Sequence, residues 1–255
     1  MVKNVSAAGG RWLDVSAERF PGWIASFAVR HAAAAAGGAG APLAAERGQY
    51  TVTFRVPDGS AAECHPPFAE SLALPGDVQP GDVQPGDALS GDALSGDRAE
   101  PDRLAAAIAA HAAVPRTVGV LLARLGGYAA GVFTGYPPAL ADSKVGSRLV
   151  HGRSAAGGWS QHRFARRREK QASEAMGAAA DTAVMVFGRG PKLDAVVLGG
   201  DKRAVAELRG DARLAPYLAL ATERFLTVPD PKRAVLEGTP AQFTAVRIRH
   251  TEPPA

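Results

Sequence analysis

Apolar residues in the second half of the chain follow the pattern of a β-sheet. The segment RTVGVLLARLGGYAAGVFTG (116–135) contains two apolar runs on either side of Gly126 and Gly127, which is typical of a β-hairpin. A possible third strand follows at 143–152. Two further segments, LDAVVLGG (193–200) and ERFLTV (223–228), also have the composition of strands.

A segment whose apolar residues have helical spacing lies between these predicted strands. An arginine-rich run from about residue 161 to 180 brings its apolar positions near one face of a helix, and these positions are Phe164, Ala172, Ala175, Met176 and Ala179. Residues 182–187 continue this helix or add a short strand.

Two shorter helices are predicted after it. Residues 201–210 begin at Asp201, a favourable N-cap, and end at Gly210. Residues 230–250 are helix-like, with a break where a glycine and a proline occur. The resulting order of strands and helices predicts an α/β fold in which helices cover a mixed or parallel sheet.

The first hundred residues are less regular. We expect a helix over 11–33, a small-residue linker over 31–46 and a strand over 49–61 that ends in a Pro-Asp-Gly turn. Another helix is expected over 101–114.

A repeat interrupts this region. Gly-Asp recurs every five residues between 75 and 97. A calcium-binding repeat would need a higher density of ligands, including a bidentate glutamate. Because the units contain few apolar residues, they cannot form a core, and we interpret them as a flexible insertion. The expected organisation is therefore an N-terminal region over 1–74, the insertion over 75–100 and a catalytic domain over 101–250.

Composition limits the class of protein. Of the 255 residues, 46% are hydrophobic, enough for a sizeable core. The single cysteine, Cys64, excludes an internal disulfide framework. No signal peptide is expected, and no apolar run of about 18 residues is present. We expect a cytoplasmic monomer that does not enter a membrane.

The positive charge is local. Residues 151–170 contain six basic residues and one acidic residue. Their net charge of +5 exceeds the +4 of the whole chain and leaves −1 for the remainder. The basic residues are Arg153, Arg163, Arg166, Arg167, Arg168 and Lys170. An anionic partner that binds at this one segment is therefore expected.

The sequence AGGWSQHRFARRREKQ (156–171) has two interpretations. It could be a plain strand-to-helix connection followed by a solvated helix face. Against this, the arginines are dense enough to repel one another, and Trp159 lacks a periodic apolar setting. Gly157 and Gly158 allow the backbone to approach a ligand closely. Arginines that bind phosphate, beside an aromatic ring that stacks on a base, predict contact with single-stranded or splayed RNA.

Gln161 suggests chemistry rather than binding alone. An amide is neither an acid nor a base at neutral pH, but it can orient a water molecule or stabilise an oxyanion. Such an amide contributes to catalysis only where the partner supplies most of the catalytic site. A Gly-Gly-x-x-Gln loop tip that enters a preformed RNA active centre has this property.

Other candidate sites are weaker. LGGD (198–201) follows a strand but lacks the glycine patterns of nucleotide-binding loops, and Asp201 is better explained as a helix cap. Ser154 lies near His151 without the sequence of a nucleophile elbow. The six histidines show no ligand spacing with Cys64 or with paired acids. No metal and no cofactor are predicted.

The segments 145–164, 193–205 and 223–237 resemble the bacterial, actinobacterial-type branch of the Vms-like release-factor family. That family is related to the eukaryotic and archaeal release factors, whose loop carries Gly-Gly-Gln; here Trp159 and Ser160 separate the glycines from Gln161. The resemblance implies an RNase H-like mixed sheet flanked by helices, similar to the middle domain of those release factors, with a small N-terminal extension.

The resemblance also implies a hydrolase for ribosome rescue and translation quality control, which frees nascent chains from peptidyl-tRNA on stalled or split large ribosomal subunits. Gln161 would carry catalysis, and Gly157 and Gly158 would shape its loop. The residues expected to contact tRNA or ribosomal RNA are Arg153, Trp159, Ser160, Arg163, Arg166, Arg167, Arg168 and Lys170. Two alternatives remain open: a tRNA endonuclease that cuts near the CCA end, and a non-catalytic ribosome or RNA binder.

Overall fold

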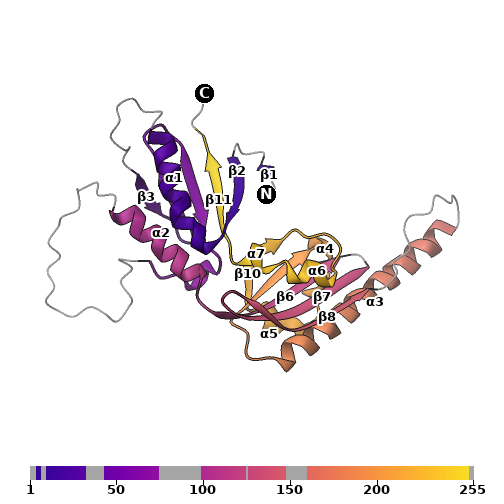
Figure 1. Cartoon of the computed structure of the whole chain (residues 1–255). Coiled ribbons are helices and arrows are strands. Elements are labelled where there is room, and N and C mark those ends of the chain that lie inside the picture. The colour runs from indigo at the N-terminus through magenta and orange to yellow at the C-terminus, as the bar shows by residue number, and fades with distance from the viewer. Residues whose placement is uncertain are drawn as a thin grey trace, which may run out of the picture. The chain divides into compact units, whose positions relative to one another are not determined.

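The computed structural model describes residues 4–6, 10–32, 43–74, 99–124, 126–147 and 160–252. They belong to two compact units, each built on its own sheet. The first unit comprises residues 1–113 and 244–255, and the second comprises residues 114–243. Both combine a sheet with helices (Figure 1), so the predicted mixed α/β class is confirmed.

The second unit contains a five-stranded mixed sheet in the order β10-β9-β6-β7-β8. Strands β6 (Arg116–Arg124) and β7 (Gly127–Gly135) form the predicted hairpin, and β8 (Ala139–Ser147) continues it antiparallel. The third strand thus begins earlier than the predicted 143–152, and residues 148–152 lie outside the described residues. Strands β9 (Ala195–Gly200) and β10 (Ala221–Leu226) are parallel to β6, as expected for crossover connections through helices.

Helices cover both faces of this sheet. On one face, α3 (Ser160–Arg189), α4 (Lys202–Leu208), η3 (Ala212–Leu214) and α5 (Ala215–Leu218) share a core with β6, β7 and β9. On the other face, α6 (Arg233–Glu237) places Leu236 against Gly131, and α7 (Pro240–Phe243) places Phe243 against Phe133. Residues 182–187 continue α3, which settles the alternative left open by their sequence.

The first unit contains a six-stranded antiparallel sheet in the order β1-β2-β11-β5-β4-β3. Its strands are β1 (Asn4–Ser6), β2 (Gly10–Val15), β3 (Ala44–Arg47), β4 (Val52–Arg55), β5 (Ala61–His65) and β11 (Val246–Thr251). Helices α1 (Phe20–Ala32) and α2 (Ala99–Ala112) pack against each other and against this sheet. The amino-terminal region is therefore more than the small extension that we expected.

Three elements of the first unit differ from the sequence prediction. Residues 11–15 form strand β2, and after the short helix η1 (Ala17–Arg19) α1 begins only at Phe20. Part of the predicted linker 31–46 is strand β3, and the end of the predicted helix 230–250 is strand β11. The cause is pairing between distant segments, since β11 lies between β2 and β5 and satisfies the backbone groups of both.

Other predictions for this unit are confirmed. The expected strand 49–61 contains β4, a turn follows at 57–59, and the next strand, β5, was not predicted. The helix expected over 101–114 is α2 with an earlier start. A further short helix, η2 (Ala69–Ser71), follows β5.

The Gly-Asp repeat of 75–97 lies outside the described residues. The expected range 101–250 of the catalytic domain stays a prediction, although by packing its ends, α2 and β11, belong to the first unit.

Candidate functional site

The connection from β8 to α3 begins at one end of the second sheet, and the strand register identifies which end it is. Ser147, the last residue of β8, pairs with Gly127, and Gly127 pairs with Arg124 at the end of β6. Gly200 at the end of β9 pairs with Ala123. The segment that carries the predicted site is therefore attached at the carboxyl end of the parallel strands, where open α/β sheets place their ligands.

The predicted site residues divide into two groups. Arg153, Gly157, Gly158 and Trp159 lie outside the described residues. The backbone of the remainder is helical, because α3 begins at Ser160.

Gln161 is the second residue of α3 and lies in its first turn. Its expected position was the tip of a loop, and the structure instead includes it in a helix. The physical reason is local: after Gly158 no glycine and no proline occurs before Gly177, so the run SQHRFARRREKQ has no helix breaker.

Four of the basic residues share one face of α3. Positions 163, 166, 167 and 170 have the i, i+3, i+4, i+7 spacing of neighbours on a helix surface. Eleven and eighteen residues after Arg163, close to whole numbers of turns, the same line passes through Glu174 and Asp181, which are both exposed. The backbone positions of the four residues therefore lie on the same line of the helix as these two exposed residues. We call Arg163, Arg166, Arg167 and Lys170 the basic stripe.

Arg168 differs from these four positions. It falls on the line of Ala175 and Ala179, which are fully buried against the sheet farther along α3. The cluster of arginines predicted as one RNA contact is thus divided between two faces of the helix.

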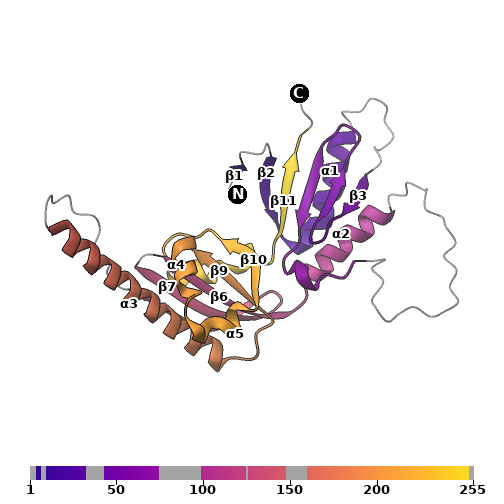
Figure 2. The ribbon, with the colours of Figure 1, turned by 180° about the vertical axis from the view of Figure 1, so that it is seen from behind.

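The second half of α3 anchors the helix. Its buried residues are Ala175, Met176, Ala179, Ala180, Ala183, Val186 and Phe187, and they pack in one cluster with strands β6, β7 and β9. The amino-terminal turns extend beyond the strands in both views (Figures 1 and 2). A helix of 30 residues is about 45 Å long, so α3 can hold Gln161 and the basic stripe away from the sheet that supports it.

Close packing at the strands supports this anchor. The ring of Tyr128 lies over Gly146 of β8, where a Cβ atom would overlap it. At Gly119 of β6, a Cβ atom would come within 3.1 Å of the ring of Phe187. Both glycines allow an aromatic side chain to lie directly on the sheet beneath α3.

The LGGD segment is structural, as its sequence suggested. The Asp201 carboxylate accepts hydrogen bonds from the backbone N–H groups of Arg203 and Ala204, at 2.7 and 3.4 Å. Gly200 has a φ of +104°, and a Cβ atom there would overlap the backbone of Ala123. The two observations describe a tight strand-to-helix turn with a capped helix.

A serine, a histidine and an aspartate meet in the first unit but do not form a catalytic triad. Nδ1 of His31 lies 2.8 Å from Asp58 and 3.1 Å from Oγ of Ser60. In a triad the acid and the nucleophile contact opposite ring nitrogens, whereas here both face the same one. Ser60 is also fully buried. The cluster therefore joins the end of α1 to the turn between β4 and β5.

Within the described ranges, no three His, Cys, Asp or Glu side chains are grouped so that they could hold a metal ion. None of the helices in those ranges is both long and apolar enough to cross a membrane. Ser154 and His151 lie outside the described residues.

The sequence analysis did not single out three exposed cations near this site. Lys202 and Arg203 begin α4, and Lys232 precedes α6, so all three lie at the carboxyl end of the second sheet. Lys202 and Arg203 are neighbours in sequence, but only the strand register brings Lys232 to the same end, and no local motif marks the three residues.

Comparisons with known proteins agree with the predicted resemblance. A family model described as the actinobacteria/chloroflexi VLRF1 release factor matches residues 116–249, just over half of the chain. A crystal structure of an archaeal translation termination factor, aRF1, is 13% identical with a TM-score of 0.34, over 50% of this chain and 36% of that one. The Vms1 mitochondrial localization core is 10% identical with a TM-score of 0.33, over 78% and 76%.

This chain therefore spans about a third of the length of the aRF1 structure. No curated protein matches the chain.

Proposed function

Because the chain belongs to the actinobacteria/chloroflexi VLRF1 release-factor family, we propose that it hydrolyses peptidyl-tRNA on the large ribosomal subunit and so frees stalled nascent chains. The family match covers the second unit, including α3 with Gln161, and continues into β11. Release factors act on the ester that joins the peptide to the 3′ end of tRNA, and this ester is the proposed substrate.

The observation that carries this proposal is the position of Gln161. It lies in the first turn of a helix that extends beyond its sheet, directly before the basic stripe. A group that acts inside an RNA active centre has to project from its own fold and has to be flanked by cations. Both properties belong to the amino-terminal turns of α3.

In the proposed reaction, the Gln161 amide orients a water molecule toward the ester carbonyl carbon. The water oxygen forms the new bond to that carbon, the bond to the ribose oxygen breaks, and a proton passes to this oxygen. The products are a free peptide carboxylate and tRNA with its 3′ end intact. An amide cannot accept the proton of water at neutral pH, so the RNA partner has to supply that group.

The remaining predicted residues take binding roles in this proposal. The basic stripe would bind RNA phosphates along the amino-terminal turns of α3. Gly157 and Gly158 would allow close approach of the backbone, and Trp159 would stack on a base. Arg153, Ser160 and Arg168 would add polar contacts to tRNA or ribosomal RNA.

The test is peptide release from purified large subunits that carry peptidyl-tRNA. Wild type is compared with Gln161→Ala, and Gln171→Ala is the matched control, because it removes the same side chain ten residues farther along α3. We expect Gln161→Ala to lower the release rate by about 10²-fold or more, as for loss of one preorganised polar group. Gln171→Ala should release peptide like wild type.

The released tRNA is analysed on a sequencing gel. Full-length tRNA supports ester hydrolysis, whereas tRNA shortened near the CCA end would replace the proposal with a nuclease. Release that does not depend on Gln161 would contradict its catalytic role. Absence of release by wild type, with salt-sensitive binding intact, would leave a non-catalytic RNA binder.

A further inference from the structure

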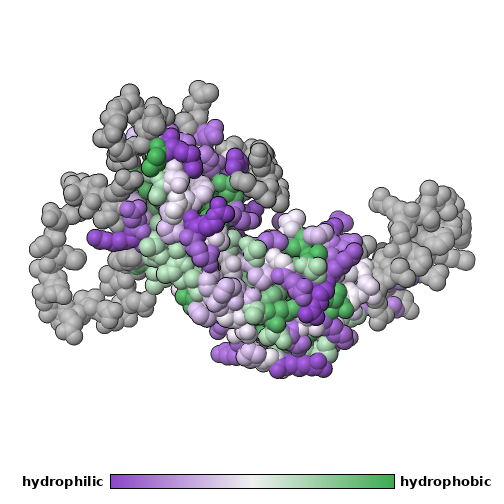
Figure 3. Space-filling view, viewed as in Figure 1, coloured by the Kyte–Doolittle hydropathy of each residue, from purple (hydrophilic) through white to green (hydrophobic). Residues whose placement is uncertain are grey.

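Three exposed cations are arranged around the carboxyl end of the second sheet. Lys202 and Arg203 occupy the first two positions of α4, directly after β9, and Lys232 directly precedes α6. All three are exposed, and none forms an ion pair with another residue in the described part of the chain. Hydrophilic residues lie over the region of α6 in the space-filling view (Figure 3).

Packing fixes the positions of Lys202 and Arg203. The preceding glycine, Gly200, pairs with Ala123 on the neighbouring strand, and Asp201 caps the helix. The ammonium group of Lys202 lies 6.0 Å from the ring centre of Phe225 on β10, a distance at which the ring attracts the cation. The two cations therefore extend from a rigid strand-to-helix turn.

Lys232 is held at the same end by the β6–β7 hairpin. Arg124 donates a hydrogen bond of 2.8 Å to the carbonyl oxygen of Val228 and lies 3.7 Å from Asp230. Pro231 lies directly against Gly127, since a Cβ atom there would be 3.4 Å from its ring. The hairpin lies one to two strand spacings from β9, about 5–10 Å across the sheet.

The segment that leads to Gln161 starts from this end of the sheet, since Ser147 is paired there with Gly127. The opposite end also contains exposed cations, namely Arg189 at the end of α3 and Lys192 before β9, and Arg209 is exposed at the end of α4. Charge alone therefore does not separate the two ends. The difference is that the segment leading to Gln161 starts at the carboxyl end and not at the other.

We propose that Lys202, Arg203 and Lys232 bind the phosphate backbone of the RNA whose 3′ end the α3 segment engages. This inference rests on the proposed function and names a second contact surface for the same substrate. The three side chains position RNA without reading its sequence, as phosphate contacts do. Two sources of the phosphates, the acceptor arm of the tRNA and ribosomal RNA, share this chemistry.

The experiment compares two triple variants with the same change in charge. The test variant is Lys202→Ala/Arg203→Ala/Lys232→Ala, and the matched control is Arg189→Ala/Lys192→Ala/Arg209→Ala in the same unit. Release from large subunits that carry peptidyl-tRNA gives kcat and KM. Fluorescence anisotropy measures binding to an acceptor-arm RNA hairpin and, separately, to vacant large subunits.

The test variant should raise KM roughly tenfold with kcat unchanged, since exposed charge contacts are individually weak. The slope of log affinity against log salt should fall by about one for each lost contact. The control should match wild type in both. Weaker binding to the RNA hairpin assigns the contacts to the acceptor arm, and weaker binding to vacant subunits alone assigns them to ribosomal RNA.

Equal behaviour of the two triple variants in release and in both binding assays would overturn the inference. That result is distinct from failure of the proposed function, in which wild type binds RNA but releases no peptide. The binding assays decide the inference in that case as well. Thermal unfolding of each variant checks that the substitutions leave the fold intact.

Discussion

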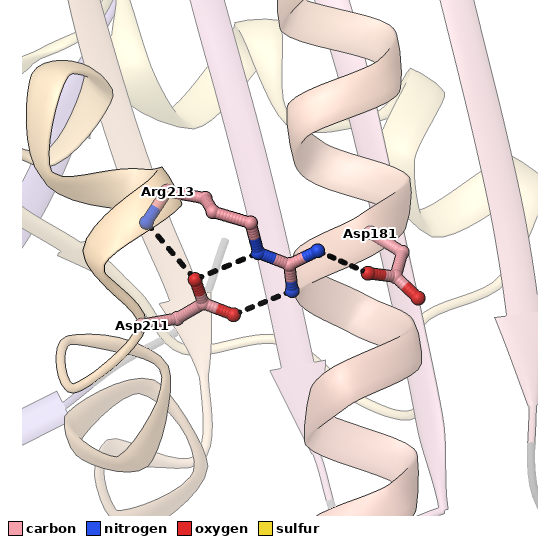
Figure 4. Close-up of polar contacts among 3 residues, drawn as sticks. All are labelled: Asp181, Asp211 and Arg213. Atoms are coloured by element: carbon pink, nitrogen blue, oxygen red, sulfur yellow. Dashed lines mark hydrogen bonds and ion pairs between the residues drawn. The ribbon is translucent and has the colours of Figure 1, made fainter.

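The guanidinium of Arg213 donates a hydrogen bond of 2.7 Å to Asp181 and thereby joins η3 to helix α3 (Figure 4). The same guanidinium donates to both carboxylate oxygens of Asp211, at 3.0 and 2.7 Å. One arginine thus connects two acidic residues from different elements at the anchored half of α3. Hydrogen bonds from Arg213 hold the pKa of Asp211 below its ordinary value of 3.8.

We expect the contribution of Arg213 to stability to depend on pH. Because the folded-state pKa of Asp211 is lowered, the stabilisation is fully present above about pH 4 and is lost as pH falls through that lower pKa. Arg213→Ala should therefore lower the melting temperature at pH 7 by a few degrees at most, since the pair is exposed, and the difference from wild type should vanish in stronger acid. A difference that stays constant from pH 7 down to pH 2.5 would show that Arg213 acts through packing instead.

Two glycines of the second unit should respond to alanine in opposite directions. Gly200 has a left-handed φ, and a Cβ atom there would overlap the backbone of Ala123, so Gly200→Ala should cost about 3 kcal/mol or more. Gly177 lies within α3, and a Cβ atom there would meet nothing within 4 Å. Gly177→Ala should stabilise the protein by about 0.5–1 kcal/mol through helix propensity. Urea denaturation followed by circular dichroism measures both, and equal losses would contradict the geometry at Gly200.

Cys64 should report on the opening of the first unit. The thiol is fully buried on β5, burial raises its pKa, and it is the only cysteine of the chain. We expect iodoacetamide to leave the folded protein unmodified at pH 8 and to modify it completely in urea, as measured by intact mass. Rapid modification without denaturant would mean that β5 is accessible in the native state.

Ile248 should be critical for the same unit. It lies on β11 between Leu13 and Cys64, and its side chain is fully buried. Ile248→Ala should cost about 2–5 kcal/mol and speed the modification of Cys64. Val29→Ala is the control, because Val29 is an exposed apolar residue of α1. Its expected effect is within about 0.5 kcal/mol. Equal labelling rates for the two variants would show that β11 is not needed to protect β5.

The local sequence pattern was sufficient to predict most of the strands and helices of the second unit. The hairpin of β6 and β7 follows from a Gly-Gly turn between apolar runs, and Asp201 at the start of α4 follows from N-cap chemistry. Both features depend on residues that are neighbours in sequence, so a pattern of a few residues contains the necessary information.

The first unit could not be predicted in this way. Strand β11 alternates Val246 and Ile248 with Arg247 and Arg249, but this short signal directly follows a helix-like segment. Strand β2 is a short segment directly before the helical stripe of α1, so the local pattern does not distinguish it from the start of that helix. Each is stabilised by pairing with the other, more than two hundred residues away along the chain.

The candidate site also contains features that local sequence predicts and features that depend on pairing between distant segments. The basic stripe is visible in the sequence because its members are three or four residues apart on one helix. Lys202 and Lys232 belong to different elements, and they lie at the same end of the second unit only because β9 and the β6–β7 hairpin are held in register.

The place of β11 in the first sheet has a consequence for the order in which the protein forms during its own synthesis. The ribosome produces residues 114–243, the complete second unit, before it produces β11. Until residues 246–251 leave the exit tunnel, β2 and β5 lack the strand that lies between them. The nascent chain can therefore complete the second unit first, while the first unit waits for β11 to be made.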